Sequence, residues 1–169
     1  MNSKRLYFFN ILNSILPPSS FNSLKTKLLR WAGIIIGNNC EISGGAKIVG
    51  NGNLLIGNNV FIGMEALIMI NEGSTVEIQD YSIIGTRSTI VTGFHPITPD
   101  GPRIIGYEGT NSKIKICKGS SVGTRVLILP GITVNEMSHC AAGSVVTKDV
   151  PPFTRVGGVP AKFMKKLNE

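Results

Sequence analysis

Cysteine is scarce in this 169-residue chain, and its three cysteines, Cys40, Cys117 and Cys140, form no pairs in the sequence. An odd number without Cys-x-x-Cys spacing argues against a disulfide framework and against a zinc site. A metal site at His139 and Cys140 is disfavoured because adjacent residues of a strand point to opposite faces. We therefore expect no metal, and we expect free, buried thiols in a reducing cytoplasm.

Aromatic residues and long apolar runs are also few. Aromatics make up 7% of the chain and no nucleic-acid-binding module is recognisable, so the net charge of +7 does not indicate a nucleic-acid partner. No apolar run approaches the roughly 20 residues that a membrane-spanning helix needs. These absences leave a single soluble domain of ordinary size as the prediction.

Acidic residues are absent from the first 31 residues, which are basic and apolar. A secretory signal has a similar outline, but Asn10 and Asn13 interrupt the apolar run and no small-x-small cleavage site follows. We predict instead two short helices broken at Pro17-Pro18, the second beginning near Ser19 or Ser20 and covering one end of the fold. The residues expected to pack there are Phe21, Leu24, Leu28, Leu29 and Trp31. Basic charge beside apolar surface adds the hypothesis that this segment contacts the anionic inner face of a membrane.

A six-residue repeat runs from Ile36 to Val150. Each hexad opens with an aliphatic residue or, once, a cysteine, and its fifth place is small or β-branched. Such a repeat is typical of a parallel β-helix, in which each hexad forms a short strand and a turn and the stacked coils bury a shared core. The first places are Ile36, Ile42, Ile48, Ile56, Ile62, Ile68, Ile78, Ile84, Ile90, Ile116, Val122, Ile128, Val134, Cys140 and Val146.

The repeat is interrupted three times: the spacing of first places rises to eight after Ile48, to ten after Ile68 and to twenty-six after Ile90. Each interruption follows a third hexad, so all three insertions leave a three-sided coil at one corner. We predict an all-β fold, a parallel β-helix of about five three-sided coils with short N-terminal helices. Its parts are a helical segment at 1–33, the β-helix at 34–152 with an extruded loop at 92–113, and a C-terminal turn and tail at 153–169. A sandwich of short strands would not explain the shared phase.

Two stretches resemble the hexapeptide-repeat acyltransferases, and within them the galactoside and maltose O-acetyltransferases. The first contains Thr92-Gly93-Phe94-His95-Pro96; the second runs from Ala142 to Pro152 and continues with Gly157-Gly158-Val159-Pro160-Ala161-Lys162. The resemblance covers about Ile36 to Lys166. It implies a left-handed β-helix, a homotrimer with active sites between neighbouring prisms, and transfer of an acetyl group from acetyl-CoA to a hydroxyl or an amine.

His95 is the only histidine in the extruded loop, and it matches the family's catalytic histidine. A hydroxyl is almost fully protonated at neutral pH, so the reaction needs a base, and neutral imidazole suits that task. No serine or cysteine has a convincing adjacent base, which favours direct transfer in a ternary complex over an acyl-enzyme. His139 lies in an outward place with no motif around it.

The second half of the chain is basic where coenzyme A brings phosphates. The resemblance assigns Thr124, Ala142, Thr147, Lys148, Lys162 and Lys165 to the pantetheine groove and the phosphates. Small residues there leave room for the pantetheine arm, and lysines neutralise phosphate charge. The turn Gly157-Gly158-Val159-Pro160 should carry the chain back across the last coil.

The acceptor is less defined, because Ser121 replaces a Trp that the family often has and Gly63 replaces an acceptor-side Asn after Phe61-Ile62. Glu65 and Asn71 are the remaining acceptor candidates, although either can be a plain corner residue. The leading hypothesis is an O-acetyltransferase acting on a sugar in surface-polysaccharide biosynthesis. The alternatives are an amino-sugar N-acetyltransferase and a non-catalytic trimeric scaffold. A serine acetyltransferase is disfavoured because the large N-terminal helical domain is missing.

Overall fold

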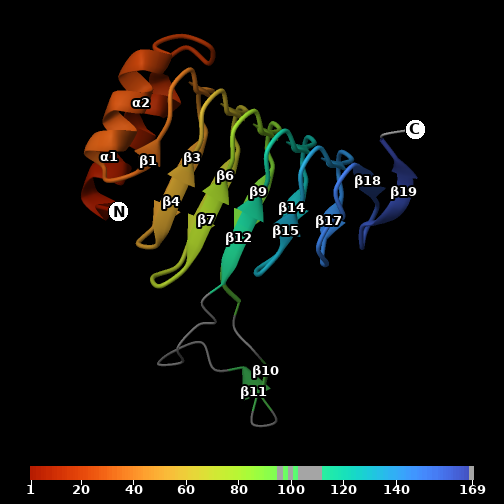
Figure 1. Cartoon of the computed structure of the whole chain (residues 1–169). Coiled ribbons are helices and arrows are strands. Elements are labelled where there is room, and N and C mark those ends of the chain that lie inside the picture. The colour runs from red at the N-terminus through yellow and green to blue at the C-terminus, as the bar shows by residue number, and fades with distance from the viewer. Residues whose placement is uncertain (95–96, 99–100, 103–111, 168–169) are drawn as a thin grey trace.

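The computed structural model describes residues 1–94, 97–98, 101–102 and 112–167, and it is a three-sided prism of short strands closed at one end by two helices (Figure 1). Sheet A contains β1 (Ile35–Ile36), β4 (Asn53–Ile56), β7 (Thr75–Ile78), β12 (Lys113–Ile116) and β15 (Thr133–Val134). Sheet B contains β2 (Glu41–Ile42), β5 (Phe61–Ile62), β8 (Ile83–Ile84), β13 (Ser121–Val122), β16 (His139–Cys140), β18 (Thr154–Gly157) and β19 (Lys162–Lys166). Sheet C contains β3 (Lys47–Gly50), β6 (Leu67–Ile70), β9 (Thr89–Val91), β14 (Leu127–Ile128) and β17 (Val145–Val146).

The chain visits the three sheets in the order A, B, C, and each strand pairs in parallel with the strand one coil later. In sheet A, Ile36 lies beside Ile56, which lies beside Ile78, and the first-place residues of the later coils continue that row. This architecture is a left-handed parallel β-helix of five complete coils. The fold class predicted from the hexads is confirmed.

The predicted inward positions form the core of the prism. First-place residues are at most 6% exposed and fifth-place residues at most 7% exposed. Serines at the fifth place are buried because each hydroxyl donates to a backbone carbonyl. The acceptor lies one coil later for Ser82, Ser88 and Ser120. It lies three residues earlier in the same turn for Ser138 and Ser144. The Ser82 hydroxyl donates to a carbonyl oxygen at 2.9 Å and the Ser88 hydroxyl at 2.6 Å. These bonds offset the desolvation of a polar group inside an apolar core.

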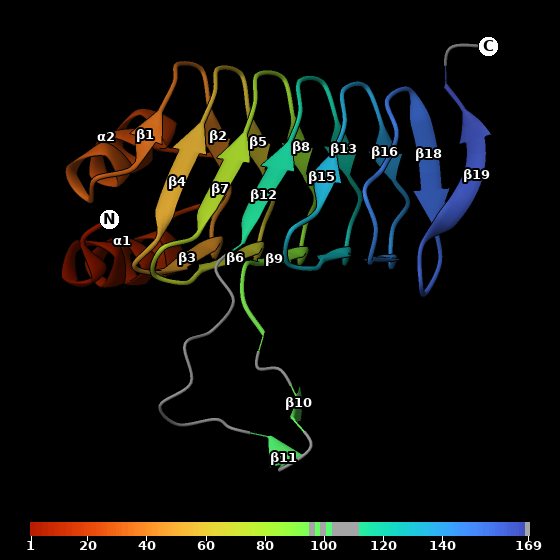
Figure 2. The same ribbon diagram turned by 60° about the horizontal axis from the view of Figure 1, so that its bottom comes forward.

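The three insertions all leave the prism at the corner between sheets C and A, here called the C/A corner, as predicted. The strands next to an insertion have three or four residues, and those that follow an insertion add an inward row that the hexads did not reveal. Leu54, Val76 and Ile114 form that row and are at most 2% exposed. The longest insertion departs after β9 and returns at β12, and its short β10 (Ile97–Thr98) and β11 (Gly101–Pro102) lie away from the prism (Figure 2).

Side chains of the N-terminal helices α1 (Ser3–Ile15) and α2 (Asn22–Trp31) complete the hydrogen bonds of the first coil. The Asn10 amide donates to a β3 carbonyl oxygen at 2.8 Å and accepts from a β3 backbone N–H at 3.1 Å. Asn22 accepts from the backbone N–H of Ile42 at 3.2 Å, and the Lys25 amine donates to the Ile42 carbonyl at 2.9 Å. The Arg30 guanidinium donates to the carbonyl oxygens of Ile36, the last residue of β1, and of Gly37. All three edge strands are thereby prevented from pairing with another chain.

The expected packing of the second helix was wrong in detail. The helix begins at Asn22 rather than at Ser19 or Ser20, and Phe21, Leu24 and Trp31 are 55%, 43% and 48% exposed. Leu29 is buried as expected, and Lys25 and Thr26 are buried beside it. The helix is rotated because its amine and amide side chains face the strand edges. Leu28 is half-buried against the core, as expected, while Phe21, Leu24 and Trp31 lie on the outer side of the helix.

The opposite end of the prism is closed by an antiparallel pair. β18 pairs in parallel with β16, and β19 returns antiparallel along β18 after the turn at Gly157–Pro160, as predicted. Gly158 has a φ of +100°, a value that glycine adopts without strain. Within residues 1–94 and 112–167, no helix has both the length and the apolarity to cross a membrane.

Candidate functional site

Two of the predicted coenzyme residues, Thr124 and Ala142, lie on successive coils at the corner between sheets B and C, here called the B/C corner. The backbone N–H of Gly143 donates to the Thr124 carbonyl at 2.8 Å, so the two turns are stacked. Gly143 has a φ of +74° and no atom within 4 Å of the place of a Cβ. Both Thr124 and Ala142 are exposed. The structure therefore brings this pair together on a narrow surface ridge with small side chains.

Three more predicted residues, Thr147, Lys148 and Lys162, line one pocket of about 360 Å³ at the C-terminal end of the prism. Its apolar wall includes Val146, Val156 and Phe163. β17 joins this pocket to the B/C corner, because its Val146 lines the pocket and Ala142 lies just before the strand. The sixth residue, Lys165, does not line the pocket; it is exposed on β19, opposite Arg155. Two lysines beside an apolar wall suit a ligand that has both phosphate and apolar parts.

The proposed acceptor residue Glu65 forms an ion pair at the B/C corner. The Nε of Arg87 lies 2.7 Å from the Glu65 carboxylate, and both side chains are about half exposed. The hydrogen bond from Arg87, together with its charge, lowers the pKa of Glu65 below its usual value. Glu65 and Arg87 both have positive φ, so they occupy equivalent corner positions of successive coils. The role of Glu65 in binding the acceptor stays a prediction.

Asn71, the other acceptor candidate, lies at the base of the extruded segment. Its backbone N–H donates to the hydroxyl of the buried Thr92 at 2.9 Å, and its amide side chain packs against Gly93. The returning end is held by the same turn, because the backbone N–H of Ser112 donates to the Ser74 hydroxyl at 3.2 Å. The turn from Asn71 to Ser74 thus fixes both ends of the segment that carries the predicted base. His95 itself lies outside the described residues.

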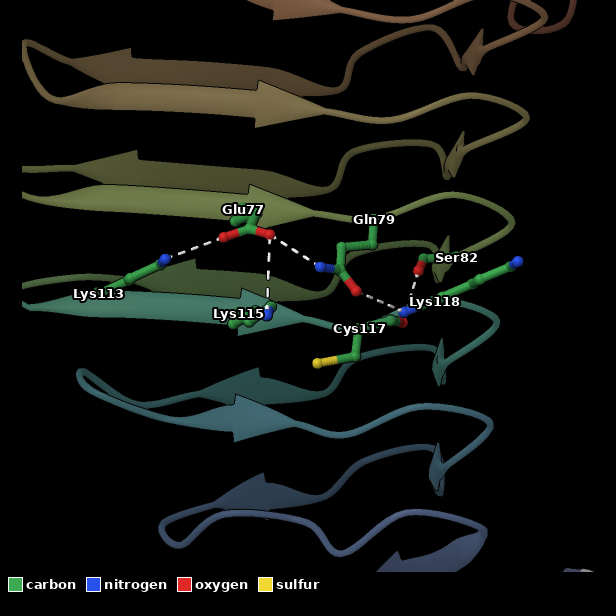
Figure 3. Close-up of polar contacts among 7 residues, drawn as sticks. All are labelled: Glu77, Gln79, Ser82, Lys113, Lys115, Cys117 and Lys118. Carbon is green, nitrogen blue, oxygen red and sulfur yellow. Dashed lines mark hydrogen bonds and ion pairs between the residues drawn. The ribbon is translucent and has the colours of Figure 1, made fainter.

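A network of polar side chains on sheet A also holds the returning end of this segment (Figure 3). Glu77 on β7 lies 3.0 Å from the Lys113 amine and 3.9 Å from the Lys115 amine, both on β12. Gln79 donates to Glu77 at 2.8 Å and accepts from the backbone N–H of Lys118 at 3.0 Å. The hydrogen bond from Lys113 is the main reason that the pKa of Glu77 is lowered. Sequence reasoning missed this network, although the alignment of β7 with β12 in adjacent coils would have predicted it.

Neither the cysteines nor His139 joins the candidate site. All three cysteines are free and buried, as predicted for the inward places of Cys40 and Cys140, and burial raises the pKa of Cys140 to about 12. His139 and Cys140 point to opposite faces of sheet B: Cys140 is fully buried and His139 is half-buried on the outer face. Burial and the nearby Arg155 lower the pKa of His139. Among the residues that the structure describes, no three His, Cys, Asp or Glu side chains gather as a metal site would require.

Comparison with known proteins gives two galactoside O-acetyltransferases as relatives. The one from Escherichia coli K12 is 31% identical over 119 residues, which are 69% of this chain and 56% of the relative. The one from Lactococcus lactis is 29% identical over 137 residues, which are 79% of this chain and 63% of the relative. The chain thus spans less than two thirds of the length of these relatives. No family model matches the sequence.

Among solved structures, a hexapeptide-repeat acetyltransferase from Vibrio cholerae is similar over nearly the whole chain. The TM-score is 0.75 with 25% identity, and the match covers 99% of this chain and 91% of the other. A second crystal structure of that protein, in complex with acetyl-coenzyme A, matches with the same TM-score and identity. The similarity therefore includes the N-terminal helices and the C-terminal strands as well as the coils.

Proposed function

The chain belongs to the hexapeptide-repeat acyltransferases, and from this premise we propose that it transfers an acetyl group from acetyl-CoA to a sugar hydroxyl. The observation that carries the proposal is the pocket in which Thr147, Lys148 and Lys162 come together. The family resemblance assigns the same three residues to coenzyme binding. The acetyl-CoA complex of the Vibrio cholerae protein supports the same donor.

The coenzyme would extend from the C-terminal pocket to the B/C corner. Lys148 and Lys162 would neutralise its phosphates, while its slender pantetheine arm would pass the small side chains of Thr124 and Ala142. The thioester would then lie near the middle coils of the prism. Lys165, which is exposed on β19 and does not line the pocket, would contribute charge rather than a direct contact there.

His95 would act as general base on the acceptor. As the acceptor oxygen attacks the thioester carbonyl, its proton passes to the imidazole; the tetrahedral intermediate then expels the coenzyme thiolate, which takes that proton back. This direct transfer needs no enzyme nucleophile. The high pKa and burial of Cys140 agree with a path that uses no cysteine.

We further propose a homotrimer, because the family resemblance implies active sites between neighbouring prisms, and the apolar outer face of sheet C supports such an assembly. The outer face of sheet C is rich in apolar side chains, including Leu67, Met69, Leu127 and Val145. Three prisms with sheet C turned toward a common axis would set the B/C corner of each beside the C/A corner of its neighbour. The extruded segment of one subunit would then reach the coenzyme of the next.

The named relatives favour a hydroxyl acceptor over an amine. Gly63 stands where the family has an acceptor-side Asn, and this difference argues against a simple galactoside as the acceptor. We propose that the acceptor is a sugar precursor of a surface polysaccharide and that the reaction takes place in the cytoplasm. The rival on the same scaffold is an amino-sugar N-acetyltransferase, in which the base removes an ammonium proton. The alternative outside the enzymes is a trimeric scaffold protein without catalytic activity.

Release of free coenzyme thiol from acetyl-CoA across a panel of sugars, amino sugars and serine tests the proposal. We expect turnover with one or more sugar hydroxyl acceptors and product masses that show an acetyl ester. Turnover confined to amino sugars with an amide product would establish the rival. If the protein shows no turnover and does not bind the coenzyme, only the non-catalytic scaffold remains as an interpretation.

Replacement of the pocket lysines should weaken coenzyme binding. Because a hydrogen bond to a charged group contributes about 1.5–3 kcal/mol, Lys148→Gln and Lys162→Gln should each raise the KM for acetyl-CoA by about 10-fold or more, with little change in kcat. Lys166→Gln is the matched control, since Lys166 is exposed on the same strand as Lys162 and does not line the pocket. An unchanged KM in both pocket variants would contradict the assigned coenzyme site.

A further inference from the structure

The two N-terminal helices carry large apolar side chains that are exposed at the end of the prism. Two of them, Tyr7 and Ile11, line a pocket of about 290 Å³ with Lys47 and Val49 of β3. α1 buries Leu6, Phe9 and Asn13 against the first coil. Other residues of α1 are large, apolar and exposed, and α2 adds two that were expected to be buried. We call this surface the apical patch: Tyr7, Phe8, Ile11 and Ile15 of α1, which are 69%, 52%, 48% and 74% exposed, with Leu24 and Trp31 of α2.

The apical patch is one continuous surface rather than scattered side chains. The rings of Phe8 and Trp31 meet edge to face with centroids 6.2 Å apart, which joins the two helices. Both helices lie across the end of the prism, and α1 runs beside the edge of sheet C (Figures 1 and 2). A helix that is apolar on both sides is normally buried on both sides. Here a partner is needed for the outer side.

The charge around the patch points to an anionic partner. No acidic residue precedes Glu41, and Lys4, Arg5, Lys27 and Arg30 of the same two helices are exposed. The Arg5 guanidinium lies 4.7 Å above the centre of the Trp31 ring, so the cation borders the apolar surface directly. A second copy of the same patch would bring like charges together. An acidic lipid surface would complement them.

We propose that the apical patch docks on a membrane surface that bears anionic phospholipid headgroups. Tyr7 and Trp31 have the amphipathic rings that favour the boundary between headgroups and acyl chains. Ile11 and Ile15 would enter that boundary from a helix lying in the membrane plane, and Lys4 and Lys27 would contact headgroup phosphates. The prism would then stand away from the membrane, with its C-terminal pocket at the far end.

Trimerisation would strengthen the docking, a step that rests on the proposed function. Parallel prisms around one axis place three apical patches on the same side, so a single membrane can engage all three at once. Sedimentation velocity measures the trimer without lipid. A monomeric protein that still binds anionic vesicles weakly would remove this step and leave the docking itself supported.

Flotation with phosphatidylcholine vesicles, with and without phosphatidylglycerol, tests the docking. The full-length protein should bind the vesicles that contain phosphatidylglycerol, bind plain phosphatidylcholine at least several-fold less, and dissociate as salt is raised. The double variant Tyr7→Ser/Ile15→Ser should weaken binding to the vesicles, because both side chains are mostly exposed and are therefore available to enter the membrane boundary. Lys4→Glu/Lys27→Glu should reduce it roughly 10-fold or more, since each lysine near an anionic surface contributes separately.

Two control variants remove similar groups elsewhere. Ile35→Thr removes a side chain that is 67% exposed on the side wall of the prism, and Lys166→Glu reverses a charge at the far end. Both should bind vesicles like the unmodified protein, and circular dichroism should show that every variant is folded. Absence of binding to anionic vesicles, equal binding to neutral ones, or a changed oligomeric state in Tyr7→Ser/Ile15→Ser would overturn the proposal.

Discussion

Turnover with acetyl-CoA should fall by about 10²–10⁴-fold when His95 is replaced by alanine, the loss expected when a general base is removed. The KM for acetyl-CoA should change little, because His95 is assigned to the acceptor proton and not to the coenzyme. The structure supports this expectation through the anchored ends of the segment: Thr92 and Ser74 hold them by buried hydroxyl groups. Initial rates with the best acceptor of the panel provide the measurement.

His139→Ala is the matched control, because His139 is the other histidine of the chain and lies on β16 outside the candidate site. It should retain near-normal turnover. His95→Asn keeps a polar side chain of similar size and should be as inactive as the alanine variant. Full activity in either His95 variant would end the assignment of this residue as the base, while loss of coenzyme binding would show that the substitution disturbed more than proton transfer.

The core of the prism was predictable from the sequence because its period is set by backbone geometry. Each first-place residue faces inward once per hexad, so Ile62 or Val122 can be assigned without knowing any contact. The inner row of Leu54, Val76 and Ile114 was missed because it lies within the insertions, where the period of six is broken. Apolar residues at every second position around these three residues would have indicated the row, because a strand buries every second side chain.

The sequence predicted the parts of the candidate site that lie within one short stretch of chain. It did not predict the contacts between residues that are far apart in the sequence. Lys148 and Lys162 belong to one recognisable string, and they share a pocket. The ion pair of Glu65 with Arg87 joins residues 22 positions apart, and it follows from the register only once the insertion lengths are assigned to corners. The buried Lys25 could not be foreseen, because lysine is almost never fully buried and the apolar stripe of its helix pointed elsewhere.

Lys25→Met should lower the free energy of unfolding by about 2–4 kcal/mol. The Lys25 amine is fully buried and donates to the carbonyl oxygens of Pro17, Pro18 and Ile42 at 3.2, 3.1 and 2.9 Å. It therefore joins the linker between the helices to the edge of sheet B. Methionine fills a similar volume but leaves these acceptors without donors, a loss only partly offset by removal of a buried charge.

Urea unfolding measures this effect, with Lys27→Met as the control, because Lys27 lies on the same helix and is exposed. The control should change the unfolding free energy by less than about 0.5 kcal/mol. Burial is the main reason that the pKa of Lys25 is lowered, with the charge of Glu41 opposing it. Between that lowered pKa and the ordinary value of 10.5 the unfolded chain binds more protons than the folded one, so this group adds stability as the pH rises. The difference in unfolding free energy between the unmodified protein and Lys25→Met should therefore widen toward alkaline pH, and equal stability of the two proteins at every pH would show that the amine does not hold the cap in place.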